Sequence, residues 1–203
     1  PQLGGGDVLE ITPGKFEPYG HQARAFERLS SRLLGEGKRP QPTLVTTGTG
    51  SGKTESFLYP ILDHVVRHRR QGGTGVSGLI LYPMNALATD QAQRLARMIT
   101  EDPQLGGIRA AIYTGDGGDA KRSRVTSEGP ITDREAIQSN PPDILLTNYK
   151  MLDQMLLRVA DQKVWSESAL SLRYLVLDEF HTYDGAQGTD VAMLLRRLGL
   201  KLK

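Results

Sequence analysis

Short apolar runs alternate along this chain with longer segments of helical spacing. The runs are rich in Leu, Ile and Val and are bounded by Gly, Pro or polar residues, which is typical of buried strands. They predict strands at residues 43–47, 78–82, 109–113, 143–148 and 172–177.

Between these runs, apolar residues recur every three or four positions, as they do on one side of an amphipathic helix. This spacing predicts helices at residues 21–34, from 51 onward, at 85–99, from about 150 onward and at 189–198. Because strands alternate with helices, the pattern predicts an α/β fold in which a parallel β-sheet has helices on both faces.

The length of 203 residues favours one domain. Residues 1–15 are rich in Gly and Pro and are expected to form an irregular lead-in, so the predicted domain covers residues 16–203. Residues 115–142 are polar and contain three prolines, which predicts a mobile insertion with one short helix near 133–138.

A phosphate-binding loop is the first candidate for chemistry. Residues 47–54 read Thr-Gly-Thr-Gly-Ser-Gly-Lys-Thr between a predicted strand and a predicted helix. Glycines allow backbone N–H groups to turn toward an anion, and the helix N-terminus adds partial positive charge. Lys53 would contact the β- and γ-phosphates, and the Thr54 hydroxyl would ligate Mg²⁺. The predicted nucleotide-binding residues are Thr47, Gly48, Thr49, Gly50, Ser51, Gly52, Lys53, Thr54 and Glu55.

An acidic pair, Asp178 and Glu179, follows the predicted strand at 172–177. Ligand sites in open α/β sheets form at the carboxyl ends of the strands, so this pair is expected at the same edge as the phosphate-binding loop. Asp178 would hold Mg²⁺, and Glu179 would polarise the attacking water. The alternatives are an acidic strand end facing solvent and, for the loop, a glycine-rich turn.

These motifs and their order resemble the first RecA-like domain of a superfamily two DExH-box helicase, and the resemblance covers nearly the whole chain. The general P-loop has Gly where this chain has Thr47, which suits helicases, and Phe180 replaces the commoner Ala. Residues 183–188 and 194–198 are similar to the branch of Lhr-like and YprA-like bacterial DNA helicases, some of them tied to DNA repair and some to phage defence.

The resemblance also implies roles for residues outside the phosphate site. Residues 16–22 look like the adenine-reading Q motif, in which Gln22 would bond the adenine edge and Tyr19 would stack on or flank the base. His181 would link the nucleotide site to a second motor domain. The residues expected to contact a nucleic-acid backbone are Pro83, Asn85, Thr114, Gly115, Thr147 and Asn148.

Each of these roles has a structural alternative. Gln22 could be a solvated helix residue, and His181 a hydrogen-bonded structural histidine. Thr147 and Asn148 could cap the following helix, since both residue types are good N-caps.

Composition adds only limits. The formal net charge of +2 is too small to establish nucleic-acid binding, and the absence of Cys excludes disulfides and Cys-ligated metals in this segment. The apolar runs are shorter than a membrane span, so no membrane partner is expected, and a cytoplasmic location is predicted.

The resemblance therefore predicts an ATP-binding motor domain that uses ATP and Mg²⁺ to move along or unwind nucleic acid. Single-stranded DNA is the expected partner, RNA is the alternative in the same fold, and a docking or switch module without motor activity is the third. The second RecA-like domain is expected elsewhere in the same parent protein, so the isolated domain should be nearly inactive.

Overall fold

The computed structural model describes residues 8–11, 17–32, 34, 40–46, 52–115 and 120–203. The chain divides into two compact units, residues 1–71 and 72–203, which are described separately. The single domain predicted over residues 16–203 stays a prediction.

The first unit is built on two packed helices, α1 (Gly20–Leu29) and α2 (Lys53–Arg70). The apolar stripe predicted along α2 is buried, and Phe26 of α1 contacts Tyr59 of α2 edge to face. Helix α1 is shorter than predicted, because the backbone turns extended at Ser30. The Ser30 hydroxyl instead donates to the carbonyl of Val8, 2.8 Å away.

The strand predicted at residues 43–47 is wrong for the residues that the structure describes. Residues 41–46 belong to no strand, and Leu44 is 72% exposed. A short apolar run becomes a strand only when another backbone pairs with it, and the described part of residues 41–46 has no such pairing. Thr47 lies outside the described residues.

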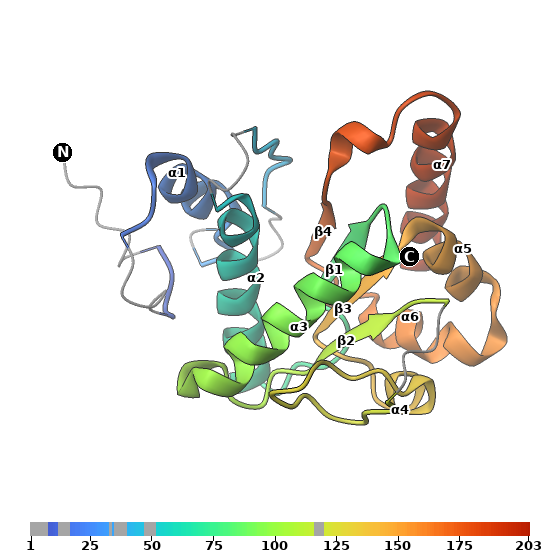
Figure 1. The fold of residues 1–203 in the computed structure, drawn as a ribbon, viewed down its shortest axis with the longest axis horizontal. Coiled ribbons are helices and arrows are strands. Elements are labelled where there is room, and N and C mark those ends of the chain that lie inside the picture. Colours follow the sequence, from blue (N-terminus) through green and yellow to red (C-terminus); the bar gives the residue numbers. More distant parts are fainter. Residues whose placement is uncertain (1–7, 12–16, 33, 35–39, 47–51, 116–119) are drawn as a thin grey trace. The chain divides into compact units, whose positions relative to one another are not determined.

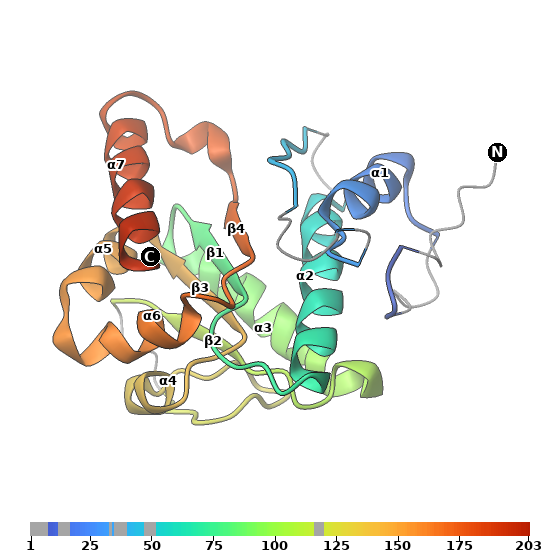
Figure 2. The same cartoon turned by 180° about the vertical axis from the view of Figure 1, so that it is seen from behind.

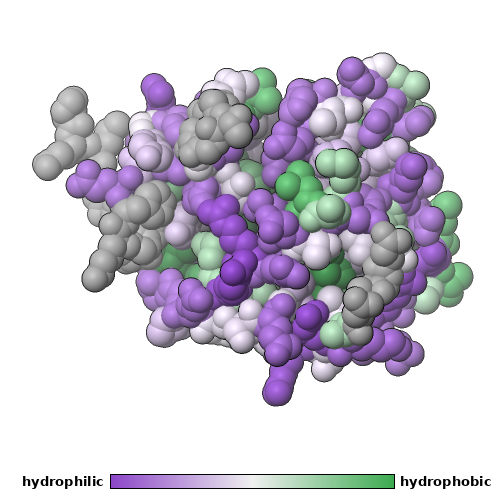
Figure 3. All heavy atoms as spheres, viewed as in Figure 1, coloured by the Kyte–Doolittle hydropathy of each residue, from purple (hydrophilic) through white to green (hydrophobic). Residues whose placement is uncertain are grey.

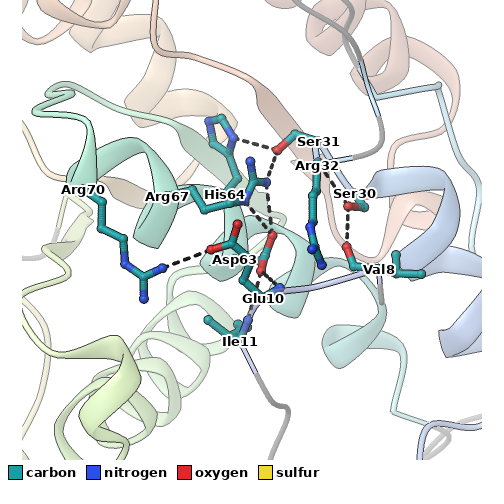
Figure 4. A network of polar contacts seen from close by, with 10 residues as sticks. All are labelled: Val8, Glu10, Ile11, Ser30, Ser31, Arg32, Asp63, His64, Arg67 and Arg70. Atoms are coloured by element: carbon teal, nitrogen blue, oxygen red, sulfur yellow. Dashed lines mark hydrogen bonds and ion pairs between the residues drawn. The ribbon is translucent and has the colours of Figure 1, made fainter. Parts of the chain in front are cut away.

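Part of the lead-in is held on helix α2 (Figure 4). The buried carboxylate of Asp63 accepts hydrogen bonds from the backbone N–H groups of Glu10 and Ile11 and from the guanidinium of Arg67. Arg67 also donates to the Ser31 hydroxyl, 2.6 Å away. We call these five residues the Asp63 network. Residues 8–11 are therefore anchored although they belong to no helix or strand, and the irregular lead-in over residues 1–15 stays a prediction.

The second unit contains a four-stranded parallel sheet in the order β2-β3-β1-β4 (Figure 1). The strands are β1 (Gly78–Tyr82), β2 (Ala110–Tyr113), β3 (Ile144–Asn148) and β4 (Tyr174–Leu177). They confirm four of the predicted strands. Strand β4 is less buried than predicted, because it lies at an edge of this sheet and Leu175 is exposed.

Helices cover both faces of this sheet, which confirms the predicted fold class (Figures 1 and 2). Helix α3 (Asn85–Glu101) packs against β1, β2 and β3 on one face. Its outer side is hydrophilic (Figure 3). The other face packs with residues of α5 (Tyr149–Leu157), α6 (Gln162–Ser168) and α7 (Gly185–Lys201) in one apolar core.

Helix α6 was not predicted. It is only two turns long, and its main contribution to the core is Trp165, whose side chain is fully buried and whose indole N–H donates to the Met155 carbonyl. Helix α7 begins earlier and ends later than the predicted helix at residues 189–198.

The insertion predicted at residues 115–142 is more tightly packed than expected where it is described. Ile131 is fully buried, donates its N–H to the carbonyl of Ala110 and accepts from the N–H of Ile112. The predicted short helix is present as α4 (Arg134–Ser139). The segment at Ile131 therefore lies beside strand β2, which the polar composition alone did not indicate.

Candidate nucleotide and nucleic-acid site

The first unit holds one candidate site, at the N-terminus of helix α2. Gly52 precedes the helix with a φ of 74°, a left-handed conformation that favours glycine. Lys53, Thr54 and Glu55 form the first helical turn, where N–H groups without helical partners can face an anion. Residues Thr47, Gly48, Thr49, Gly50 and Ser51 lie outside the described residues.

Gln22 connects the Q-like segment to this helix start. Its Oε1 accepts from the backbone N–H of Tyr19 at 2.8 Å, and its Nε2 donates to the carbonyl of Gly52 at 3.0 Å. The side chain is only 2% exposed, so Gln22 is not the solvated residue of the structural alternative. Tyr19 is exposed and stacks on His21. Contact of either residue with adenine stays a prediction.

The second unit holds another candidate site, at the carboxyl edge of its parallel sheet. Tyr82 at the end of β1 is paired with Asn148 at the end of β3, and Tyr113 at the end of β2 is paired with Thr147. The loops that follow these strands therefore start at one edge. This register brings the predicted residues Asn85 and Asn148 into contact, with Asn148 Nδ2 donating to Asn85 Oδ1 at 2.5 Å.

A cavity of about 250 Å³ opens at this edge. Its lining, which we call the strand-end cavity, consists of Pro83, Asn85, Asn148, Tyr149, Lys150 and Gln187. Three of the six were predicted to contact nucleic acid. Amide groups and a lysine ammonium are donors that suit the oxygens of a phosphate or sugar backbone.

Two predicted contact residues differ in how they use their side chains. Asn148 caps helix α5 by accepting from the Met151 N–H at 2.8 Å, as its structural alternative proposed. Thr147 is fully buried and donates to the Tyr113 carbonyl at 2.6 Å instead of capping the helix.

The remaining two predicted residues follow strand β2. The Thr114 carbonyl accepts from the Arg134 guanidinium at 3.1 Å, and Gly115 lies at the surface. Neither lines the strand-end cavity.

The acidic pair lies directly after β4. Asp178 continues the pairing with β1, because its N–H donates to the Leu81 carbonyl at 3.0 Å. Glu179 has a φ of 49°, the only positive φ of a non-glycine residue in the described chain. Backbone strain of this kind is concentrated at functional sites. The Glu179 carbonyl accepts from the N–H and the hydroxyl of Thr182, which hold the turn.

His181 lies close to this pair but faces solvent. Its Nδ1 is 3.4 Å from Glu179 Oε2, and its side chain is 75% exposed. His181 is therefore not a core residue, and its structural alternative, a histidine that is hydrogen-bonded within the protein, stays a prediction. A role of His181 toward a second domain stays a prediction.

The Asp178 carboxylate contributes to raised pKa values of two buried tyrosines. Burial, together with the nearby Asp178 carboxylate, raises the pKa of the Tyr82 hydroxyl far above its usual value. Burial raises the pKa of Tyr183 to about 12, and the negative charges of Asp178 and of ionised Tyr149 contribute further. Both hydroxyls are therefore protonated and can act as hydrogen-bond donors at neutral pH.

A magnesium ion fits the chemistry of the acidic pair. Mg²⁺ is usually bound through one or two carboxylates together with substrate phosphates and water. Within the described residues no group of three or more His, Asp or Glu side chains could hold a metal by itself. The half-buried Asp178 carboxylate suits the more open kind of site.

Sequence reasoning missed two residues of the cavity. Lys150 follows Asn148 directly and could have been included as a cation beside a predicted contact. Gln187 comes from helix α7, far away in the sequence, and nothing in its local pattern indicates the cavity.

A parallel sheet with polar loops at its carboxyl edge is typical of nucleotide-binding α/β proteins. Gly52 at the start of helix α2 fits the P-loop class. Residues 19–202 match the model of the DEAD/DEAH box helicase family, and the chain belongs to this family.

Several known proteins are similar to the chain. The Druantia protein DruE of Escherichia coli is 28% identical over 96% of this chain and 16% of DruE. The ATP-dependent helicase YprA of Bacillus subtilis is 31% identical over 91% of this chain and 21% of YprA. The chain thus spans about a quarter or less of the length of the curated relatives it matches.

Solved helicase structures share the fold. The DUF1998 helicase MrfA, bound to DNA and AMPPNP, is 28% identical with a TM-score of 0.68 over 93% of this chain and 22% of that chain. Mycobacterium smegmatis Lhr, bound to single-stranded DNA and AMP-PNP, is 27% identical with a TM-score of 0.67 over 91% of this chain and 21% of that chain. These matches confirm the predicted RecA-like class and support ATP as the nucleotide. No described helix is long and apolar enough to cross a membrane.

Proposed function

We propose that this chain is the ATP-binding motor domain of a DNA helicase or translocase, which couples ATP hydrolysis to movement along a strand. The observation that carries the proposal is the strand-end cavity. It gathers amide groups and a lysine at the sheet edge of a DEAD/DEAH box domain. Two solved relatives of the same fold are bound to DNA together with an ATP analogue.

The phosphates are assigned to the start of helix α2. Lys53 supplies a positive charge to the β- and γ-phosphates, and the helical N–H groups add hydrogen bonds. The left-handed backbone at Gly52 supports this assignment, because helix α2 begins directly after it and the motif has a glycine at this position.

The hydrolytic residues are assigned to the turn after β4. Asp178 would hold a magnesium ion, which would neutralise charge on the phosphates. The role of the Thr54 hydroxyl as a further magnesium ligand stays a prediction. Glu179 orients the attacking water and accepts its proton. The strained turn that is held by Thr182 supports this role, because it fixes the backbone that carries the Glu179 side chain.

The adenine is assigned to Tyr19 and Gln22. The exposed ring of Tyr19 is available for stacking, whereas Gln22 already bonds Tyr19 and Gly52. We therefore propose that Gln22 acts mainly by holding the base-contacting segment against the start of α2. His181, the second RecA-like domain and the cytoplasmic location stay predictions.

Nucleic acid is assigned to the strand-end cavity and the neighbouring loops. Asn85, Asn148 and Lys150 would contact the phosphate and sugar groups of a single strand. Such backbone contacts depend little on the base sequence of the strand. Thr147 would contribute through its backbone, because its side chain is buried.

The test is the steady-state ATPase rate of the full-length parent protein without polymer, with single-stranded DNA and with single-stranded RNA. We expect strong stimulation by DNA. Stimulation by RNA alone would transfer the proposal to RNA remodelling, and no stimulation by either would leave a nucleotide-dependent docking module.

Glu179→Gln is the matching variant. It should abolish ATP turnover while ATP binding is retained, because the amide of Gln has the shape of the Glu carboxylate but cannot accept the proton of the attacking water. The control is Glu135→Gln on the exposed side of α4, which should leave turnover unchanged. Normal turnover of Glu179→Gln would contradict the assignment.

A further inference from the structure

Tyr183 is a buried residue whose hydroxyl has no hydrogen-bond partner within the described chain. Its side chain is 7% exposed, and its N–H closes the turn after Glu179 by donating to the Phe180 carbonyl at 3.1 Å. Leaving a buried hydroxyl unpaired is unfavourable, and such groups in native proteins call for an explanation.

The backbone of Tyr183 is held close to helix α7. A Cβ atom added to Gly188 would lie 2.7 Å from the Tyr183 carbonyl oxygen, so the first turn of helix α7 approaches this backbone closely because Gly188 has no side chain. The position of the Tyr183 backbone is therefore fixed by this contact.

Tyr183 lies between the strand-end cavity and the acidic pair along a chain of contacts. Its ring meets the ring of Tyr149 edge to face, with centroids 6.4 Å apart and an interplanar angle of 90°. Tyr149 lines the strand-end cavity. Tyr183 also follows Asp178 across one short turn, η3 (Phe180–Thr182), and the Asp178 carboxylate contributes to the raised pKa of its hydroxyl.

We propose that Tyr183 is a positioning residue that couples occupancy of the strand-end cavity to the Asp178 carboxylate. A strand in the cavity displaces the Tyr149 ring, and the Tyr183 ring that packs against it follows. The Tyr183 hydroxyl then donates a hydrogen bond to Asp178, which it lacks in the free domain. The inference rests on the proposed function, because it takes the cavity as the nucleic-acid site and Asp178 as the magnesium ligand.

The coupling must be reciprocal. If single-stranded DNA favours the state in which Tyr183 bonds Asp178, then a nucleotide with magnesium at Asp178 favours DNA binding by the same factor. One hydrogen bond to a charged group corresponds to a factor of about ten or somewhat more.

The experiment uses Tyr183→Phe in the full-length parent protein. The variant keeps the ring and its contact with Tyr149 and removes only the hydroxyl. Two ratios are measured: the ATPase rate with single-stranded DNA over the rate without it, and the dissociation constant for single-stranded DNA without AMP-PNP and magnesium over that with them. We expect each ratio to fall by about tenfold or somewhat more.

Thermal stability without ligands separates this role from a structural one. Tyr183→Phe should not lower the melting temperature, because the hydroxyl it removes has no partner. The matched control is Tyr113→Phe, which removes a buried hydroxyl that donates to Asp161 at 3.0 Å. It should lower the melting temperature and leave both ratios unchanged.

Unchanged ratios in Tyr183→Phe would overturn the inference while the proposed function stands, provided that DNA stimulates the wild-type protein. A melting temperature lowered as much as in Tyr113→Phe would also overturn it, since the hydroxyl would then have a structural partner. Absence of stimulation in the wild-type protein would instead overturn the proposed function and the inference with it.

Discussion

The Asp63 network and the strand-end cavity both gather polar side chains, but they use them in opposite ways. In the Asp63 network the fully buried carboxylate accepts from the N–H groups of Glu10 and Ile11 and from Arg67. In the strand-end cavity Lys150 and Gln187 border open space. The first arrangement is complete without a ligand, and the second still has donors to offer.

The difference shows that motif residues are not all ligand-contacting residues. Gln22 belongs to the first kind, although the family resemblance assigns it to adenine, because both ends of its amide bond the protein backbone. Asn148 has a mixed role, because it caps helix α5 and also lines the cavity. Four variants test this contrast, ordered by the size of the expected effect.

Replacing Asp63 should have the largest effect on stability. Asp63→Ala removes the carboxylate partner of the partly buried Arg67 and leaves the N–H groups of Glu10 and Ile11 without their acceptor. The free energy of unfolding should therefore fall by about 3–5 kcal/mol. Urea denaturation of the chain measures this. The control is Asp102→Ala, an exposed carboxylate that caps a short helix, which should cost about 1 kcal/mol.

Gly52→Ala should cause the next largest loss of stability. The new Cβ would lie 2.3 Å from Gln22 Nε2 at a backbone φ of 74°. Left-handed strain of about 1–2 kcal/mol and the loss of one hydrogen bond of about 1 kcal/mol predict a loss of about 2–3 kcal/mol.

A double variant sharpens this test. Gly52→Ala with Gln22→Ala should cost less than the sum of the two single variants, because the smaller side chain removes the clash. Additive losses in urea denaturation would show that Gln22 and Gly52 do not interact.

Gln22→Ala alone should destabilise the chain by about 1–3 kcal/mol, because it leaves Tyr19 and Gly52 with unmade hydrogen bonds. The same variant should relax the preference of the full-length protein for ATP over GTP if Gln22 also contacts adenine. A stability loss with an unchanged nucleotide preference would leave Gln22 with the structural role only.

Lys150→Ala should have the smallest effect on stability and act on binding instead. It should weaken single-stranded DNA binding and reduce the slope of log affinity against log salt by about 0.7, the value for one phosphate contact. Lys163→Ala is the control, because Lys163 pairs with Glu167 outside the cavity. An unchanged salt slope in Lys150→Ala would remove this lysine from the interface.

The prediction of the elements succeeded where the pattern was long or where glycine and proline bounded it. Strand β1 and the start of α3 agree with the sequence to the residue, since a buried parallel strand needs little but apolar side chains. The strand predicted at residues 43–47 failed in its described part, because pairing depends on a second backbone. The buried Ile131 was missed because its neighbours are polar.

The sequence by itself determined the chemistry. The phosphate-binding motif, the acidic pair and the order of the motifs require particular residue types at short spacing, and short spacing is visible without a fold. Only the tertiary structure decided which polar groups are used up internally and which remain for a ligand. Folding buries Gln22, Thr147 and Asp63. It places Gln187 and Lys150 in the lining of one cavity, and it leaves the Tyr183 hydroxyl without a hydrogen-bond partner among the described residues. The physical reason is that burial and hydrogen bonding depend on residues distant in the chain, which no local pattern can specify.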